Sequence, residues 1–191
     1  KSGQPLGGSE TAGAQACVAL AKLGPRVTLF CNTENQHAAD GVTYLPFGWV
    51  PGAGPGNTAQ FPKGMFDYLR ATPADVVIVQ RQPMVFQFEY PSKCNILWQH
   101  DLATKSGPSN FGHVVWNLDR IWVLSQFMKR QYQSVHGGPD SLYRTTRNGV
   151  DLDLIDSVPA QERDRFKCVF TARPERGLDI LLTQAWPEIL K

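Results

Sequence analysis

A histidine at the end of an apolar run is the residue in this chain best suited to chemistry. His100 follows the run that ends at Trp98, and a histidine in such a place can exchange protons near neutral pH or hydrogen-bond a sugar hydroxyl. The structural alternative is a histidine satisfied at the edge of a sheet. Asp101, the next residue, either orients His100 or caps a turn. The segment by itself leaves both roles open.

Two further segments have the composition of phosphate-binding turns. Gly7 and Gly8 open a predicted helix, where glycines permit close approach of the backbone and free N–H groups favour an anion. Arg173 and Arg176 lie between a predicted strand and a predicted helix, where two guanidinium groups would suit a diphosphate. An ordinary tight turn and a solvated charged turn are the alternative interpretations.

Other chemistries find little support in the residue pattern. Three further histidines show no metal-ligand spacing: His37, His113 and His136. The chain has neither a GxSxG segment nor a P-loop lysine motif. Four cysteines have no zinc-site spacing, and we expect reduced, structural thiols and a cytoplasmic setting: Cys17, Cys31, Cys94 and Cys168. We therefore expect no bound metal.

Composition narrows the classes of partner. The chain has 191 residues, 42% of them apolar, which is enough for a sizeable core. Its 19 basic and 17 acidic residues nearly cancel, so nothing favours nucleic acid or an anionic membrane. Residues 1–8 do not have the pattern of a signal peptide, and no apolar run approaches the ~20 residues of a membrane helix. Membrane contact would be peripheral at most.

Helical and strand patterns alternate through the first 150 residues. Helices are predicted after Ser9 as N-cap, over 62–71 with Pro62 at the first position, over 111–117, and after Ser125 as N-cap through Val135. Strands are predicted over 26–32, 41–47, 75–80, 94–99, 121–124 and 142–147, and a loop over 48–57. This alternation predicts an α/β fold, a Rossmann-like parallel sheet with helices on both faces.

The predicted fold places several polar residues at one edge of the sheet. Ligands of such sheets bind beyond the carboxyl ends of the strands. His100, Ser125 and Asn148 each follow a predicted strand, so they are candidates for one crevice. The glycine turn at residues 7–8 lacks the strand that would normally precede it, and we expect that strand to lie before Lys1.

The character of the sequence changes after the turn at Asn148. We predict three parts: residues 1–150 as an acceptor-side Rossmann-like domain, 151–166 as a linker with a short helical piece, and 167–191 as the first βα unit of an incomplete second Rossmann-like domain. That unit would consist of a strand over 168–172 and a helix from Gly177. A single βα unit is too small to fold alone.

Five of these segments together resemble the family-4 retaining glycosyltransferases of the GT-B fold. The stretches are GGSETAGAQACVALAKLGPRVTLFCN, WQHD, IWVLSQFMKRQY, RTTRNGVDLDLI and FTARPERGLDILLTQAWPEI. The likeness lies in their order across nearly the whole chain. The last stretch is most similar to a subgroup whose motif reads roughly Ser-Pro-Asp-Arg-Gly-Leu.

The resemblance implies two Rossmann-like domains that face each other across a cleft. Such enzymes move a sugar from a nucleotide-sugar donor to a glycan, lipid or protein acceptor, retain the anomeric configuration and need no metal. By this likeness Gly7 and Gly8 match the loop near the donor diphosphate, and His100 matches the histidine at the reacting sugar. Arg176 matches the cation that steadies the leaving group, and Arg173 aligns with the other basic residue of the family.

The departures from the family pattern leave other functions open. The paired glutamates of the family's donor domain have no counterpart here, so the base and the sugar stay unnamed and we expect this chain alone to be inactive. A nucleotide-sugar epimerase of the same fold would release rearranged sugar without an acceptor. A non-catalytic glycan-binding module would bind acceptor but show no turnover.

Overall fold

The computed structural model describes residues 7–51, 60–105, 111–112, 114–160, 162, 164, 166–172 and 174–190. Two compact units divide the chain, Lys1–Val150 and Asp151–Lys191. Arg173 and His113, which the sequence singled out, lie outside the described residues.

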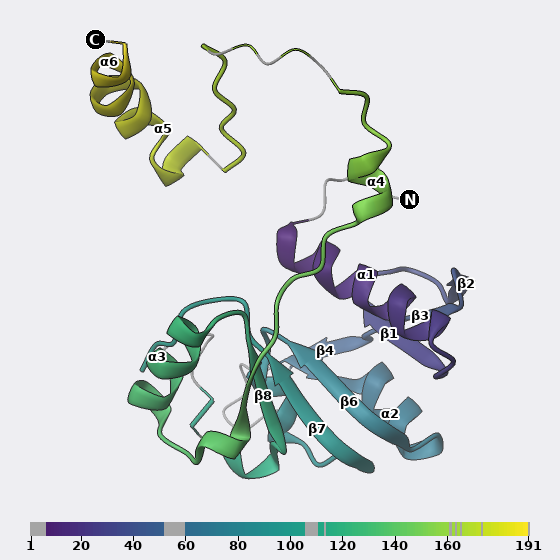
Figure 1. Ribbon diagram of the computed structural model, residues 1–191. Helices are drawn as coiled ribbons and strands as arrows, with labels where there is room; N and C mark the ends of the chain where they lie inside the picture. The colour runs from purple at the N-terminus through teal and green to yellow at the C-terminus, as the bar shows by residue number, and fades with distance from the viewer. Residues whose placement is uncertain are drawn as a thin grey trace. The chain divides into compact units, whose positions relative to one another are not determined.

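The first unit contains an all-parallel sheet of four strands, which confirms a parallel sheet for the last four predicted strands (Figure 1). The strands predicted over 26–32 and 41–47 belong to a separate sheet. Its strands are β6 (Ala74–Gln80), β7 (Ser92–Trp98), β8 (Arg120–Val123) and β9 (Tyr143–Thr145), in that spatial order. Leu97 pairs with Ile121, and Ile78 pairs with Ile96. Because parallel strands must be joined by crossovers, helical segments separate them and flank the sheet, which confirms the α/β, Rossmann-like class.

A second, smaller sheet contains β1 (Val27–Cys31), β3 (Val42–Pro46) and β2 (His37–Ala39), in that spatial order. β1 and β3 are parallel, and β2 runs antiparallel to β3. The turn between β2 and β3 consists of Asp40 and Gly41, with φ of 51° and 78°. Two successive positive φ angles suit a two-residue hairpin, for which Asp-Gly is a preferred pair. The sequence prediction missed β2.

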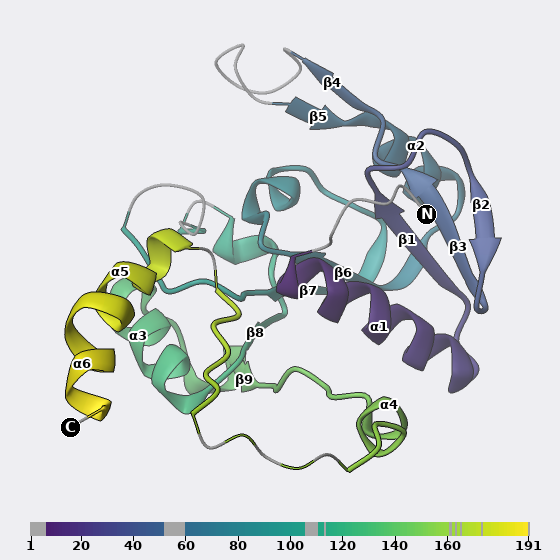
Figure 2. The same cartoon turned by 90° about the horizontal axis from the view of Figure 1, so that it is seen from above.

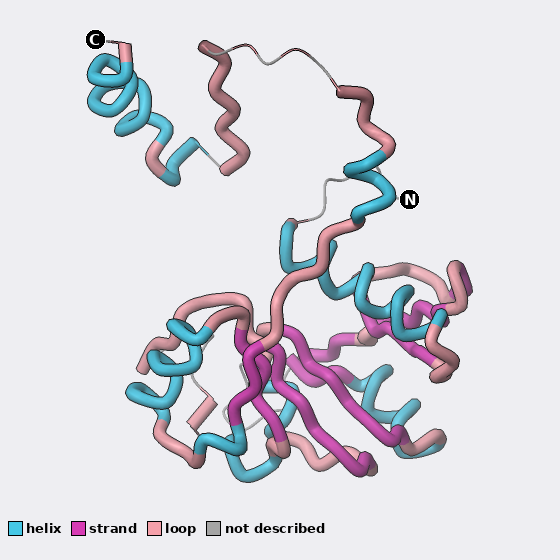
Figure 3. The backbone as a smooth tube through the Cα atoms, in the orientation of Figure 1, coloured by secondary structure: helices cyan, strands magenta, loops and turns pink. Residues whose placement is uncertain are grey.

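The helices of the first unit are α1 (Gly8–Lys22), α2 (Lys63–Ala71) and α3 (Gln126–His136) (Figure 3). The Ser125 hydroxyl accepts a hydrogen bond from the Met128 N–H at 3.1 Å, which confirms Ser125 as the N-cap of α3. The predicted cap of α1 was wrong: Gly7 is the N-cap, and the Ser9 hydroxyl instead donates to Glu10. Pro62 is the N-cap of α2 rather than its first residue.

The structure corrects two other expectations in this unit. The helix predicted over 111–117 is only the short 3₁₀ segment η2 (Val115–Asn117), and two further 3₁₀ segments are η1 (Pro83–Gln87) and η3 (Asp140–Leu142). Within the loop predicted over 48–57, residues 49–51 form β4 (Trp49–Pro51), which pairs with β5 (Gln60–Pro62). Residues 52–59 of that loop lie outside the described residues. A strand as short as β4 leaves no alternation for a sequence pattern to detect.

A single buried cluster lies against the four-stranded sheet. Met65 and Leu69 of α2 and Met128 and Tyr132 of α3 belong to the same buried cluster as Leu97 of β7. Val77 and Val79 of β6, Ile121 and Val123 of β8 and Tyr143 of β9 complete that face of the sheet. Burial alternates along β6 because successive side chains point to opposite faces.

The second unit is helical where it is regular. It contains α4 (Leu152–Asp156), η4 (Pro174–Arg176), α5 (Leu178–Ile180), the π-helical η5 (Leu181–Ala185) and α6 (Trp186–Ile189). The helix predicted from Gly177 is confirmed, and Gly177 enters it with φ of 101°. The π turn comes just before Pro187, which has no N–H to continue an α-helical ladder.

The strand predicted over 168–172 was wrong: none of those residues is assigned to a strand. A β-strand needs a neighbour to satisfy its backbone groups, and among the described residues of this unit no other strand is present. None of the helices in the described part of the chain combines the length and the apolar composition needed to cross a membrane.

We predict that Leu97→Ala destabilises the first unit by about 2–5 kcal/mol, because Leu97 is fully buried on β7 and its truncation leaves a cavity. Leu23→Ala is the matched control: Leu23 is 80% exposed after α1, so its loss should change stability by at most about 0.5 kcal/mol. Urea unfolding followed by tryptophan fluorescence measures both. Equal effects of the two substitutions would contradict the core described here.

Candidate functional site

Three segments distant in sequence meet at the carboxyl ends of β6 and β7. Gln80 is the last residue of β6, and its side-chain Nε2 donates to the Ser9 carbonyl oxygen at 2.8 Å. The same Nε2 lies 2.8 Å from His100 Nε2. Gln80 therefore connects the start of α1, where Gly7 and Gly8 lie, to the histidine beyond β7. Ligands of parallel α/β sheets bind beyond the carboxyl ends of the strands. The predicted site residues Gly7, Gly8 and His100 lie at that edge.

α1 packs closely against Gln80 at the carboxyl end of β6. A Cβ added at Gly13 would come 2.8 Å from Gln80 Oε1, a distance that real Cβ atoms do not tolerate. A side chain at position 13 would therefore displace the end of the Gln80 side chain from its place between Ser9 and His100.

Arg81 forms ion pairs with both carboxylates near His100, those of Asp101 and Glu10. Its Nε donates to Asp101 Oδ2 at 2.7 Å, and its Nη1 donates to Ser9 Oγ at 3.0 Å. Glu10 Oε1 lies 3.4 Å from the same Nη1. Arg81 has φ of 63°, in the left-handed region that non-glycine residues rarely occupy. Strain of this kind is concentrated at functional sites and is held in place by surrounding contacts.

The hydrogen bond from Gln80 sets the tautomer of His100. The amide nitrogen of Gln80 has only donors, so His100 Nε2 accepts and the neutral imidazole carries its proton on Nδ1. Burial lowers the pKa of His100 below its ordinary value and the nearby Arg81 lowers it further, whereas Asp101 and Glu10 raise it. His100 is therefore neutral near pH 7, with Nδ1–H as a donor.

This pKa shift has a defined effect on stability. Because folding lowers the pKa of His100, the unfolded chain binds more protons at pH values just below the ordinary pKa of ~6.5. The contribution of His100 to stability is therefore fully present above pH ~6.5 and decreases as the pH falls below it.

A carboxylate covers the start of α1. A Cβ built on Gly7 would lie 2.4 Å from Glu10 Oε2, so the Glu10 side chain folds back over the N-cap. Hydrogen bonds from its own backbone N–H and from Ser9 lower the pKa of Glu10. Glu10 thus occupies the helix-start position at which the sequence predicted a diphosphate, and an incoming anion would have to displace it.

The other predicted site residues of the first unit lie farther along the same edge. Ser125 follows β8, the neighbour of β7, and its hydroxyl is engaged in capping α3. Asn148 is exposed and follows β9. β9 lies two strands from β7, so the two strands are roughly 10 Å apart across the sheet. The order of the strands therefore places His100, Ser125 and Asn148 on one edge, with Asn148 the most distant.

Arg176 belongs to the second unit. It ends η4 and is exposed. Its predicted companion, Arg173, lies outside the described residues. The pairing of two guanidinium groups on a diphosphate thus stays a prediction from the sequence.

Within the described residues, no cluster of three or more histidine, cysteine or acidic side chains could hold a metal ion. The four cysteines are free thiols, and burial raises the pKa of Cys17 and of Cys31.

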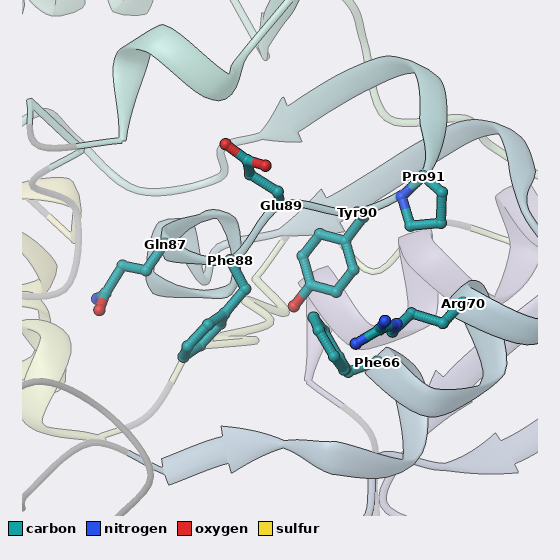
Figure 4. Close-up of a pocket in the computed structure, with 7 residues that line it drawn as sticks. All are labelled: Phe66, Arg70, Gln87, Phe88, Glu89, Tyr90 and Pro91. Atoms are coloured by element: carbon teal, nitrogen blue, oxygen red, sulfur yellow. The ribbon is translucent and has the colours of Figure 1, made fainter.

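A concave surface of about 720 Å³ lies at the other end of β7 (Figure 4). Arg70 and Phe66 of α2 line it together with the segment 87–91 that precedes β7. Burial raises the pKa of Tyr90, whose ring is drawn beside Phe66 in Figure 4. This surface is at the amino end of β7, whereas His100 follows its carboxyl end. The polar network around His100 is the better candidate because it joins ionisable groups from three elements at the edge where such sheets bind ligands.

No protein-family model and no curated protein matches this sequence. Any proposal about the function of this chain therefore depends on the geometry of the site and on the resemblance of its sequence motifs.

The sequence prediction missed Gln80 and Arg81, which connect the other residues. A signal for them was available: both follow the apolar run of β6, as His100 follows that of β7. The rule that selected His100 would have selected Arg81 as well.

We predict that Arg81→Gln raises the pKa of His100, because it removes a positive charge that disfavours the imidazolium. Arg81→Lys is the matched control, since it keeps the charge and should leave the titration close to that of the unaltered protein. The NMR titration of the His100 ring protons measures both. An unchanged or lower pKa in Arg81→Gln would show that Arg81 does not act on this histidine.

Proposed function

We propose that this chain is the acceptor-side part of a retaining glycosyltransferase that uses a nucleotide-sugar donor, followed by the start of its donor-binding part. The observation that carries the proposal is the junction of His100 with the glycine turn of α1 through Gln80, at the carboxyl edge of a Rossmann-like sheet. Gly8 and His100, which carry the resemblance to the family-4 enzymes, are 92 positions apart in the sequence (100 − 8).

The state of His100 supports a role at the reacting sugar. A neutral imidazole with its proton on Nδ1 can donate a hydrogen bond to a sugar hydroxyl. The bond from Gln80 to Nε2 holds the ring in one orientation, and Trp98 packs against it with ring centroids 4.7 Å apart. A donor held in one orientation can position the bound sugar without reorganisation of the imidazole ring.

The proposed chemistry requires stabilisation of a departing diphosphate. In this proposal Arg176, with Arg173, supplies fixed positive charge to that leaving group. Gly7 and Gly8 supply backbone N–H groups at the start of α1, after Glu10 has moved away from the N-cap. Exclusion of water from the reacting sugar would then suppress hydrolysis of the donor.

The direct test titrates UDP-, GDP- and ADP-sugars, by calorimetry, into this chain and into a longer polypeptide in which a complete donor-binding part follows it. Binding to the longer form, with transfer of the sugar to an acceptor, would support the proposal and identify the nucleotide. Release of a rearranged sugar would indicate an epimerase instead. Binding of glycans without turnover would indicate a recognition module.

We predict that, in the longer polypeptide, His100→Ala lowers turnover far more than it lowers the free energy of unfolding, because His100 acts on the substrate and is only half-buried. Steady-state kinetics and urea unfolding give the two values. Asn117→Ala is a control of the opposite kind, since its side chain donates to Phe86 O at 2.8 Å and should affect stability alone. Parallel losses in His100→Ala would support the structural role for His100.

We also predict that Arg176→Ala weakens donor binding by about 10- to 150-fold, the equivalent of one charged hydrogen bond worth ~1.5–3 kcal/mol. Arg176→Lys should recover part of the affinity, because it keeps the charge but not the bidentate geometry. Lys167→Ala, at another basic residue of the same unit, should have little effect. Calorimetric affinities for the donor measure all three, and an unchanged affinity in Arg176→Ala would remove Arg176 from the site.

A further inference from the structure

The concave surface of about 720 Å³ at the amino end of β7 has the size of a small-molecule site. Ligand sites in proteins typically combine apolar and aromatic walls with a small number of polar groups. This surface has both, because three aromatic rings and one guanidinium group line it: those of Phe66, Phe88, Tyr90 and Arg70 (Figure 4). The polar groups indicate which ligand chemistry the surface accepts.

The hydroxyl of Tyr90 is a buried polar group without a partner. Tyr90 is only 7% exposed, and its hydroxyl oxygen forms no hydrogen bond within the part of the chain that the structure describes. Burial raises the pKa of this phenol, so the hydroxyl stays protonated and is available as a donor. In Figure 4 its oxygen is drawn between the Phe66 and Phe88 rings. A buried hydroxyl without a partner costs free energy, which a ligand that accepts its hydrogen bond would recover.

Arg70 provides the positive charge of this surface. Its Cζ atom lies 5.5 Å from the centroid of the Phe66 ring, one turn earlier on α2. Residues four positions apart share one face of a helix, and cation–π attraction holds the guanidinium group over the ring. Arg70 is exposed and forms no ion pair with any other described residue. Its N–H donors are therefore available to an anion.

Backbone hydrogen bonds fix both sides of the surface. On one side, the Ser92 N–H donates to the Tyr90 carbonyl oxygen at 2.8 Å. On the other side, the Met65 N–H in the first turn of α2 donates to the Phe47 carbonyl oxygen at 3.3 Å, and α2 lies next to β3 (Figure 2). The rings of Phe66 and Tyr90 meet edge-on, with centroids 5.9 Å apart. The surface is thus formed before a ligand arrives, which lowers the cost of binding.

The charges of the surface select the anionic group of the ligand. A guanidinium group matches a carboxylate, whose two oxygens accept two parallel N–H bonds. The other charged side chain on this surface is Glu89, which is exposed and is directed away from Arg70 in Figure 4. Its negative charge repels a doubly charged phosphate more strongly than a singly charged carboxylate. One cation with one carboxylate nearby therefore favours a ligand that carries a single negative charge.

We propose that this surface binds a small aromatic carboxylate. The ligand's carboxylate accepts hydrogen bonds from the Arg70 guanidinium group and the Tyr90 hydroxyl, and its ring packs against Phe66 and Phe88. The paired charges fix the orientation of the ligand, while burial of its ring against aromatic side chains contributes affinity. The site is at the opposite end of β7 from His100, and the proposal does not depend on the glycosyltransferase activity proposed above.

The test titrates phenylacetate into this chain and follows the backbone amide and arginine Nε resonances by NMR. We expect saturable shifts at Phe88, Tyr90 and Arg70, with the resonances of α3 unchanged. Phenylacetamide has nearly the same shape without the charge, so it should bind at least about tenfold more weakly. Phenyl phosphate, which carries close to two negative charges above its second pKa of ~6, should also bind more weakly than phenylacetate.

Two substitutions separate the contributions of the polar groups. Arg70→Gln should weaken phenylacetate binding by at least about tenfold, whereas Arg130→Gln, at an exposed arginine of α3, should leave it unchanged. Tyr90→Phe removes only the hydroxyl and should weaken binding roughly two- to tenfold. The thermal midpoint of Tyr90→Phe should stay the same or rise, because the hydroxyl has no partner among the described residues.

The proposal is overturned if phenylacetate produces no saturable shift at Phe88, Tyr90 and Arg70, or if phenylacetamide binds equally well. Tighter binding of phenyl phosphate would assign the surface to phosphate esters, contrary to the proposal. A lower thermal midpoint of Tyr90→Phe would mean that the hydroxyl supports the fold and would remove it from the ligand site.

Discussion

The parallel register between β6 and β7 is the constraint on which the site depends. Gln80 and Trp98 are partners at the ends of these strands, so the residues that follow them emerge at the same edge. A slip of one residue would turn every side chain of one strand to the opposite face and separate Gln80 from His100. The buried alternation of Val77 and Val79 prevents that slip, because only one register places both in the core. Packing of the core thus determines the geometry of the polar network.

The polar network itself contributes little to stability. The Arg81–Asp101 pair joins side chains that are 41% and 51% exposed, and pairs of this kind are typically worth at most about 1 kcal/mol. Its main effect is on the protonation state of His100. Arg81 balances two carboxylates, and together with burial it keeps the pKa of His100 low. Such an arrangement, with a strained arginine at its centre, is more consistent with ligand recognition than with structural support.

The errors of the sequence prediction have particular causes. The hairpin at Asp40-Gly41 had a recognisable turn pair, but β2 beside it has only three residues, all of them exposed, so no hydrophobic pattern marked it. The segment 168–172 has the composition of a strand, yet composition cannot supply the neighbouring strand that would complete its hydrogen bonds. Arg81 was overlooked because a charged residue after an apolar run is also typical of an ordinary turn.

The sequence by itself determined the α/β class, the positions of the main strands along the chain, the N-cap at Ser125 and the choice of His100 as the leading candidate. These features depend on periodicity and on local backbone chemistry, which act over a few residues. Only the tertiary structure decided that Gln80 binds both Ser9 and His100, that Glu10 covers the start of α1, and that β1 and β6 belong to different sheets. The two contacts of Gln80 join residues 71 and 20 positions apart, which no local pattern encodes.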